Sequence, residues 1–141
     1  MVQKVLLVNK KVLLLCKDNS ALSVMAEAVL NRYLKEVMAS SAAVKKTKAI
    51  TPSVKSALIK DASWEDTYHA KTVLSLLEEE FDLVIALDKI SSKAIPEFSD
   101  NTIVIEIEYE DPNYESSTQM ERFIKTLKME LIPITRDILE L

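Results

Sequence analysis

The chain contains no glycine among its 141 residues. Average usage of about 7% would place roughly ten glycines in a chain of this length. Turns that need a positive φ angle must therefore use other residues, and Asn and Asp tolerate the left-handed conformation best. We expect such turns at Asn9, Asn19, Asn101 and Asn113.

Cysteine is also scarce, and the net charge is slightly negative. Cys16 is the single cysteine, so an internal disulfide is excluded. No apolar run approaches the ~18 residues that span a bilayer, and the apolar run at residues 5–8 is too short for the core of a signal peptide. We therefore expect a cytoplasmic protein that does not associate with membranes. The net charge of −4 gives no basic surface for nucleic acid. We also expect no cofactor and no metal.

Apolar runs alternate with amphipathic segments along a single expected domain, residues 1–141. Predicted strands are 12–16, 39–44, 82–87 and 102–108, and predicted helices are 23–38, 53–60, 68–79, 89–95 and 117–140. This alternation predicts an α/β fold, a doubly wound parallel sheet with helices on both faces. Pro133 should kink or break the last helix. Residues 1–10 are expected to form an extra edge strand or a strand exchanged with a second subunit.

The segment 12–37 joins a strand, a polar loop and a helix. Its apolar run ends at Cys16, and an amphipathic helix begins a few residues later. Backbone N–H groups and the positive end of a helix dipole then point at one place, which favours a bound anion. A thiol in that place is biased toward the thiolate. A plainer interpretation is also open, in which Cys16 is a small apolar residue of the core.

The loop itself carries a family pattern. After Cys16 come Lys17, Asp18, Asn19, Ser20, Ala21, Leu22 and Ser23, and then Val24, Met25, Ala26 and Glu27. This resembles the low-molecular-weight protein tyrosine phosphatases and their arsenate reductase relatives, whose loop reads Cys-x-Gly-Asn-x-Cys-Arg-Ser followed by x-Met-Ala-Glu. The resemblance runs from about residue 11 to the C-terminus. It implies a four-stranded sheet of order 2-1-3-4, with Cys16 as nucleophile and an oxyanion in the loop.

Three departures separate this loop from the family pattern. Asp18 replaces the glycine, Ala21 the second cysteine, and Leu22 the arginine. In the family the arginine holds two phosphoryl oxygens with its planar fork, which no aliphatic side chain can do. The Asp18 carboxylate repels a phosphate dianion and opposes thiolate formation. Lys17 supplies a point charge at most. The resemblance therefore implies a degenerate member whose site is impaired for phosphoryl transfer.

Further matches lie downstream. Residues 81–88 resemble the family's third strand, but this chain has Asp88 and Ile95 where arsenate reductases have redox cysteines. Without a resolving thiol, arsenate reduction is excluded. Residues 110–114 resemble the phosphatase Asp-Pro-Tyr-Tyr motif, which implies that Asp111 is the general acid and Tyr114 lies at the rim. A structural turn at Asp111 is equally open.

Two functions remain open after this comparison. The first is a catalytically inactive binding or regulatory module, with a protein partner and at most weak binding of phosphate or another oxyanion. The second is a phosphatase for tyrosine-phosphorylated proteins or small phosphoesters, working through a phospho-thiol intermediate at Cys16. The second requires a cation at the loop centre, and the candidates are Lys17, Lys71, Lys89 and Lys93.

Overall fold

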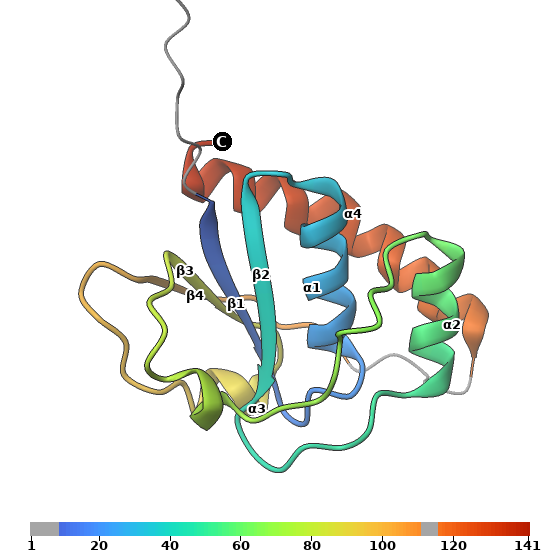
Figure 1. Cartoon of the computed structure of the whole chain (residues 1–141), viewed down its shortest axis with the longest axis horizontal. Coiled ribbons are helices and arrows are strands. Elements are labelled where there is room, and N and C mark those ends of the chain that lie inside the picture. Colours follow the sequence, from blue (N-terminus) through green and yellow to red (C-terminus); the bar gives the residue numbers. More distant parts are fainter. Residues whose placement is uncertain (1–8, 111–115) are drawn as a thin grey trace, which may run out of the picture.

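The computed structural model describes residues 9–110 and 116–141, and it contains a four-stranded parallel sheet. The strands are β1 (Lys10–Cys16), β2 (Val37–Ala43), β3 (Leu83–Ala86) and β4 (Ile103–Glu106), and they lie in the order β2-β1-β3-β4. The helical elements are α1 (Leu22–Tyr33), α2 (Pro52–Lys60), the 3₁₀ turn η1 (Val73–Leu76), α3 (Lys89–Ser92) and α4 (Ser117–Leu139). The predicted fold class and strand order are confirmed (Figure 1).

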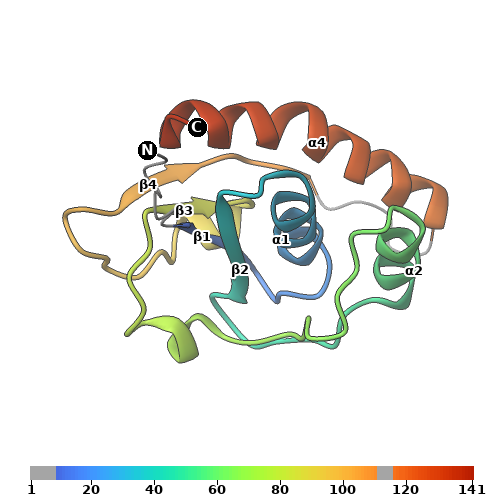
Figure 2. The same cartoon turned by 45° about the horizontal axis from the view of Figure 1, so that its top comes forward.

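The central strand β1 separates two apolar clusters. Its residues 12–16 are all buried, as expected for a parallel strand covered on both faces. Alternate residues serve opposite sides. Val12 and Leu14 pack with α1, α2 and α4 in the larger cluster, whereas Leu13 and Leu15 pack in a smaller cluster that includes Val73 of η1. Figure 2 shows α4 and α1 covering the same side of the sheet, with α2 beyond α1.

The predicted helix at 68–79 is wrong. The structure has only the short turn η1 there, and the residues before it run extended along the edge of β2. The Ala43 N–H donates to the Lys71 carbonyl, so this backbone is committed to the sheet edge. Leu74 and Leu77 are 74% and 43% exposed, so the apolar spacing does not mark a buried helix face.

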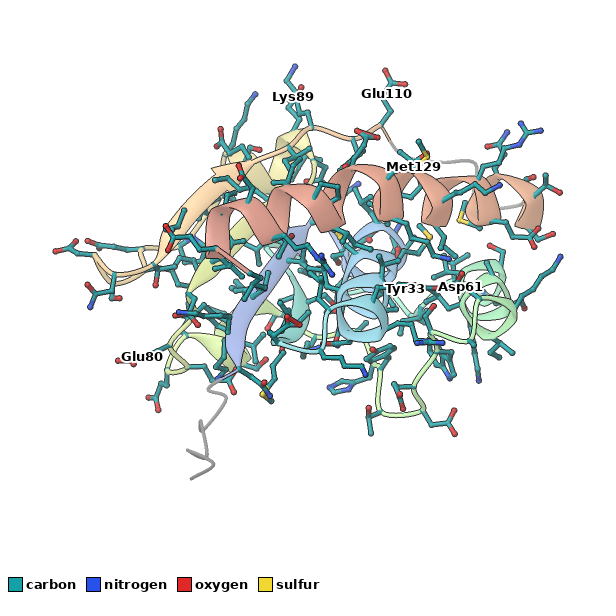
Figure 3. The ribbon with its side chains drawn as sticks, turned by 90° about the horizontal axis from the view of Figure 1, so that it is seen from above. Tyr33, Asp61, Glu80, Lys89, Glu110 and Met129 are labelled. Atoms are coloured by element: carbon teal, nitrogen blue, oxygen red, sulfur yellow. The ribbon has the colours of Figure 1, made fainter. Side chains whose placement is uncertain are left out.

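Helix α3 ends at Ser92 rather than near residue 95, and two other helix predictions also differ from the structure. Helix α1 ends at Tyr33 rather than residue 38, because Val37 already pairs with Lys10 in the sheet. Pro133 does not break α4, which continues to Leu139. The carbonyl that loses its helical donor belongs to Met129, four residues earlier. Met129 is 73% exposed on the outer side of α4 (Figure 3), where water can replace that donor.

Positive φ angles occur at Asn19, Ala62 and Glu140 in the described residues. The expectation is therefore confirmed for Asn19 and wrong for Asn101. Asn113 lies outside those residues, and so does residue 8, whose carbonyl carbon defines the φ angle of Asn9. Ala62 follows the end of α2. The Ser63 N–H donates to the Leu58 carbonyl and the Ala62 N–H to the Ile59 carbonyl. This is a Schellman ending with alanine in the place that usually holds glycine.

Candidate functional site: a buried thiol beside a closed anion loop

The candidate site lies at the carboxyl end of β1, where ligands bind in open α/β sheets. Cys16 ends the strand and α1 begins at Leu22, with a polar loop between them. The following segment fixes this loop through backbone bonds. The Val44 N–H donates to the Cys16 carbonyl at 3.1 Å, and the Thr51 N–H donates to the Ser20 carbonyl at 2.9 Å. The structure thus has the strand–loop–helix arrangement that the sequence indicated.

The thiol of Cys16 is buried and bonded. Its Sγ lies 2.9 Å from Ser23 Oγ, and Asn19 Nδ2 donates to the same hydroxyl oxygen at 2.7 Å. Burial raises the pKa of the Cys16 thiol above its ordinary value. Hydrogen bonds involving Ser23 and Asn19 work in the opposite direction, and the negative charge of Asp88 raises the pKa further. Cys16 is therefore a neutral thiol near pH 7.

Asn19 connects this thiol to a second buried group. It is fully buried with a φ of 57°, and its Nδ2 also donates to Ser41 Oγ at 2.8 Å. The Ser41 hydroxyl donates to Glu27 Oε1 at 2.5 Å, and the Lys71 N–H donates to Asn19 Oδ1 at 2.9 Å. These bonds link β1, α1, β2 and the extended segment before η1. Asn19 is therefore the point where the loop is held.

Glu27 and Ser41 were not predicted as site residues. Glu27 is only 6% exposed, and burial raises the pKa of its carboxyl group. The Ser41 hydrogen bond and the charges of Lys71 and His69 lower it. Ser41 reaches Asn19 only because β2 pairs in register with β1, with Leu14 opposite Ser41. The pair of serines in the otherwise apolar segment 39–44 was the signal for Ser41, and Glu27 belongs to the Met-Ala-Glu of the family pattern.

Asp18 stands where the family pattern has glycine, and its carboxylate bonds back to the loop. Asp18 Oδ1 accepts from the Ser20 hydroxyl at 2.7 Å and from the Ser20 N–H at 3.2 Å. Its other oxygen lies 3.9 Å from Lys48 Nζ. A backbone donor of the loop is thus already bonded to an internal anion. The nearby cation faces that anion rather than the loop centre.

Leu22 stands where the family pattern has arginine, and this side chain is apolar and buried from solvent. Leu22 is 2% exposed and packs in the larger apolar cluster together with Ala21 and Cys16. No lysine among the described residues forms a hydrogen bond with the Cys16 thiol. Lys17 and Lys93 are exposed, Lys89 points outward in Figure 3, and Lys71 contributes its backbone N–H to Asn19.

Asp88 has a structural role in this site. Its Oδ2 accepts from the Lys17 N–H at 2.9 Å, and its Oδ1 accepts from the Ser91 N–H at 2.7 Å as the N-cap of α3. One carboxylate therefore fixes both the first loop residue and the helix after β3. The resemblance placed Asp88 at the end of the third strand, where arsenate reductases have a redox cysteine, and did not predict either hydrogen bond.

The acid and rim residues predicted from the phosphatase motif, Asp111 and Tyr114, lie outside the described residues. Their roles stay predictions. Within residues 9–110 and 116–141, no group of three or more His, Cys, Asp or Glu side chains could hold a metal ion. Across the same residues, no helix is both long enough and apolar enough to cross a membrane.

Comparison with known proteins decides the family. The family described as low molecular weight phosphotyrosine protein phosphatase matches residues 11–138. The chain belongs to this family. No curated protein matches the sequence. Residues 1–10 lie outside the family match, as the sequence indicated.

Solved structures share the phosphatase fold over most of the chain. A low molecular weight protein tyrosine phosphatase from Bacillus subtilis is 20% identical, with a TM-score of 0.76 over 92% of this chain and 97% of its own. A low molecular weight phosphotyrosine phosphatase from Vibrio cholerae is also 20% identical, with a TM-score of 0.71 over 92% and 96%. An arsenate reductase from Archaeoglobus fulgidus is 28% identical, with a TM-score of 0.62 over 84% and 99%.

Proposed function

We propose that this member of the phosphatase family is a pseudoenzyme that acts as a binding or regulatory module. The observation that carries the proposal is the Asp18 carboxylate bonded to Ser20 within the anion loop. An oxyanion entering this loop would have to displace that carboxylate and approach its negative charge. Both steps weaken binding of phosphate esters.

The missing arginine strengthens the proposal. Removing one preorganised donor to a transition-state oxyanion costs ~100- to 1000-fold in rate, and a bidentate cation contributes more than a neutral donor. Here Leu22 is packed in the apolar core, so its place offers no charge and no donor. The raised pKa of Cys16 removes a third requirement, because the thiolate is the attacking species.

A phosphatase working through a phospho-thiol intermediate at Cys16 is the second candidate. One observation favours it. Because Asn19 already donates to Ser23 Oγ, the hydroxyl proton of Ser23 is free to donate to a thiolate at Cys16. The helix α1 also begins directly after the loop and directs its positive dipole end there. The thiol therefore retains two of its supports.

Oxyanion binding distinguishes the two candidates. Calorimetric titration of the parent chain with vanadate should show no heat of specific binding, with Cys16→Ser as the matched control. The double variant Asp18→Gly with Leu22→Arg restores both the flexible backbone and the fork. We expect it to bind vanadate, and each single variant to bind little, because residues of one site act non-additively.

The repair experiment has a stability requirement, since Leu22 is buried. A urea unfolding curve must first show that the double variant is folded. Specific vanadate binding by the parent chain, lost in Cys16→Ser, would contradict the pseudoenzyme proposal and favour the phosphatase. A folded double variant that binds nothing would show that the pocket itself has been rebuilt, which favours a binding function on another surface.

A further inference from the structure

One edge of the sheet is open along β4. Ile103 and Ile107 donate their N–H groups to β3 and its flanks, at Asp82 and Ala86. The backbone groups of Val104 and Glu106 point the other way, and within the described residues they have no hydrogen-bond partner. Ile103 and Val104 are 45% and 42% exposed. An open, apolar edge of this kind is a template for another strand.

The opposite edge, along β2, is closed. The Asn31 side chain donates to the Ala39 carbonyl at 3.0 Å and accepts from the Ala39 N–H at 2.8 Å. Further along the same edge, the Ala43 N–H donates to the Lys71 carbonyl. Two of the outward-facing positions of β2 are thus occupied by the chain itself. The contrast identifies β4 as the edge that accepts a partner.

Residues 4–8 have the composition of a strand. It reads Lys-Val-Leu-Leu-Val and matches residues 11–15, Lys-Val-Leu-Leu-Leu, at four of five positions. Residues 11–15 lie within β1, the central strand. The same apolar, partly β-branched run precedes the described fold and lies outside the family match.

We propose that residues 2–8 of a second copy of this chain pair antiparallel with β4. In one register Lys4 lies opposite Glu106, and Leu6 lies opposite Val104. The other face then joins Val5 to Ile105 and Leu7 to Ile103. Opposite charges and apolar pairs directly across an antiparallel ladder each stabilise the pairing. Glu108 and Glu110 follow β4 and are also exposed, so the charge near Lys4 of the second copy is negative.

The same chain cannot supply this strand in that register. A strand beyond β4 lies three strand spacings from β1, or about 14 Å. From Lys10 to Leu7 is three residues, which span at most ~11 Å. Asn9 lies near the β4 side of the sheet, since it lines one hollow with Ser99 and Asn101. A two-fold axis at this corner would let both copies exchange their segments at once. Such an exchange leaves the loop at Cys16 free.

Sedimentation of the full chain tests the exchange. We expect a dimer, and we expect Leu6→Asp or Val104→Lys to convert it to a folded monomer. Met38→Lys is the matched control, because Met38 is 53% exposed on the closed edge and its substitution should leave the dimer intact. Circular dichroism must show the fold in each variant. Glu106→Lys should weaken the dimer several-fold, and adding Lys4→Glu should restore it.

A disulfide identifies which strand occupies the edge. The double variant Leu6→Cys with Val104→Cys should form a covalent dimer under mild oxidation, seen on a non-reducing gel. A monomeric parent chain would overturn the proposal, as would an intramolecular disulfide from the chain's own segment. A dimer that survives Leu6→Asp, or one cross-linked by Val104→Cys alone, would also overturn it, because the copies would then pair β4 against β4.

Discussion

We expect Asn19 to stabilise the loop more than any other loop residue does. Both its backbone angle and its side-chain amide contribute. Its side chain is fully buried and takes part in hydrogen bonds with Ser23, Ser41 and the Lys71 N–H. Its φ of 57° lies in the left-handed region. Replacing Asn19 with alanine removes the hydrogen bonds and leaves a residue with a Cβ atom in the left-handed region, where no side-chain bond offsets the strain. Replacing it with glycine removes the bonds but suits the angle.

The magnitudes follow from those two terms. Three hydrogen bonds at roughly 0.5–1.5 kcal/mol each make a loss of about 3 kcal/mol for either variant. The left-handed angle adds ~1–2 kcal/mol for alanine, partly offset by the ~0.5–1 kcal/mol that glycine loses through its unfolded-state freedom. We therefore expect Asn19→Ala to lower the free energy of unfolding by about 1 kcal/mol more than Asn19→Gly.

Urea unfolding followed by circular dichroism measures this order. Lys125, exposed in the middle of α4, supplies the control pair, since there the glycine variant should be less stable than the alanine variant by ~1 kcal/mol. The reasoning is supported if the glycine variant is the more stable one at Asn19 and the alanine variant is the more stable one at the control site. If Asn19→Ala is as stable as Asn19→Gly, or if both stay within ~1 kcal/mol of the parent chain, the loop is not held as described.

Three further outcomes are expected. Iodoacetamide labelling of Cys16 across a pH series should give an apparent thiol pKa above the ordinary value, and a pKa near ~5 would contradict the buried, neutral thiol. Because the pKa of Glu27 is raised in the folded state, the parent chain loses stability as the pH rises from ~4.5 through that pKa. The free energy of unfolding of Glu27→Gln, measured in urea, should therefore rise with pH relative to that of the parent chain, and a constant difference would refute this. Ala62→Gly should stabilise the chain by about 1 kcal/mol at the end of α2, and an unchanged melting temperature would argue against strain there.

Local sequence was sufficient to predict the centre of the fold. The run Val12 to Cys16 has the composition of a strand buried on both faces, and the structure buries all of it. Pro52 marked the start of α2 as the first helical residue. Thr51 precedes it as the cap residue but makes no side-chain cap bond. These features depend only on residues that are neighbours in the sequence, so they can be predicted from one sequence.

Features that depend on tertiary pairing could not be predicted. The segment 68–79 has helical spacing, but Thr72 bridges to Ala43 and the sheet edge overrides that preference. The bond from Ser41 to Glu27 requires the register of β2 against β1. Both contacts join residues that are far apart in the sequence and meet only in the fold. The bond from Ser20 to Asp18 is different, because it is a local contact between residues two positions apart, a common arrangement for an Asp side chain.

Hydrolysis of an aryl phosphate tests the central claim most directly. The initial rate for the purified parent chain should equal the rate for Cys16→Ser, because the loop lacks the fork and its thiol stays protonated. The same preparation must first give a cooperative urea unfolding curve, which shows that the chain is folded. Turnover well above the Cys16→Ser rate would contradict the account and establish a working phosphatase with an unusual loop.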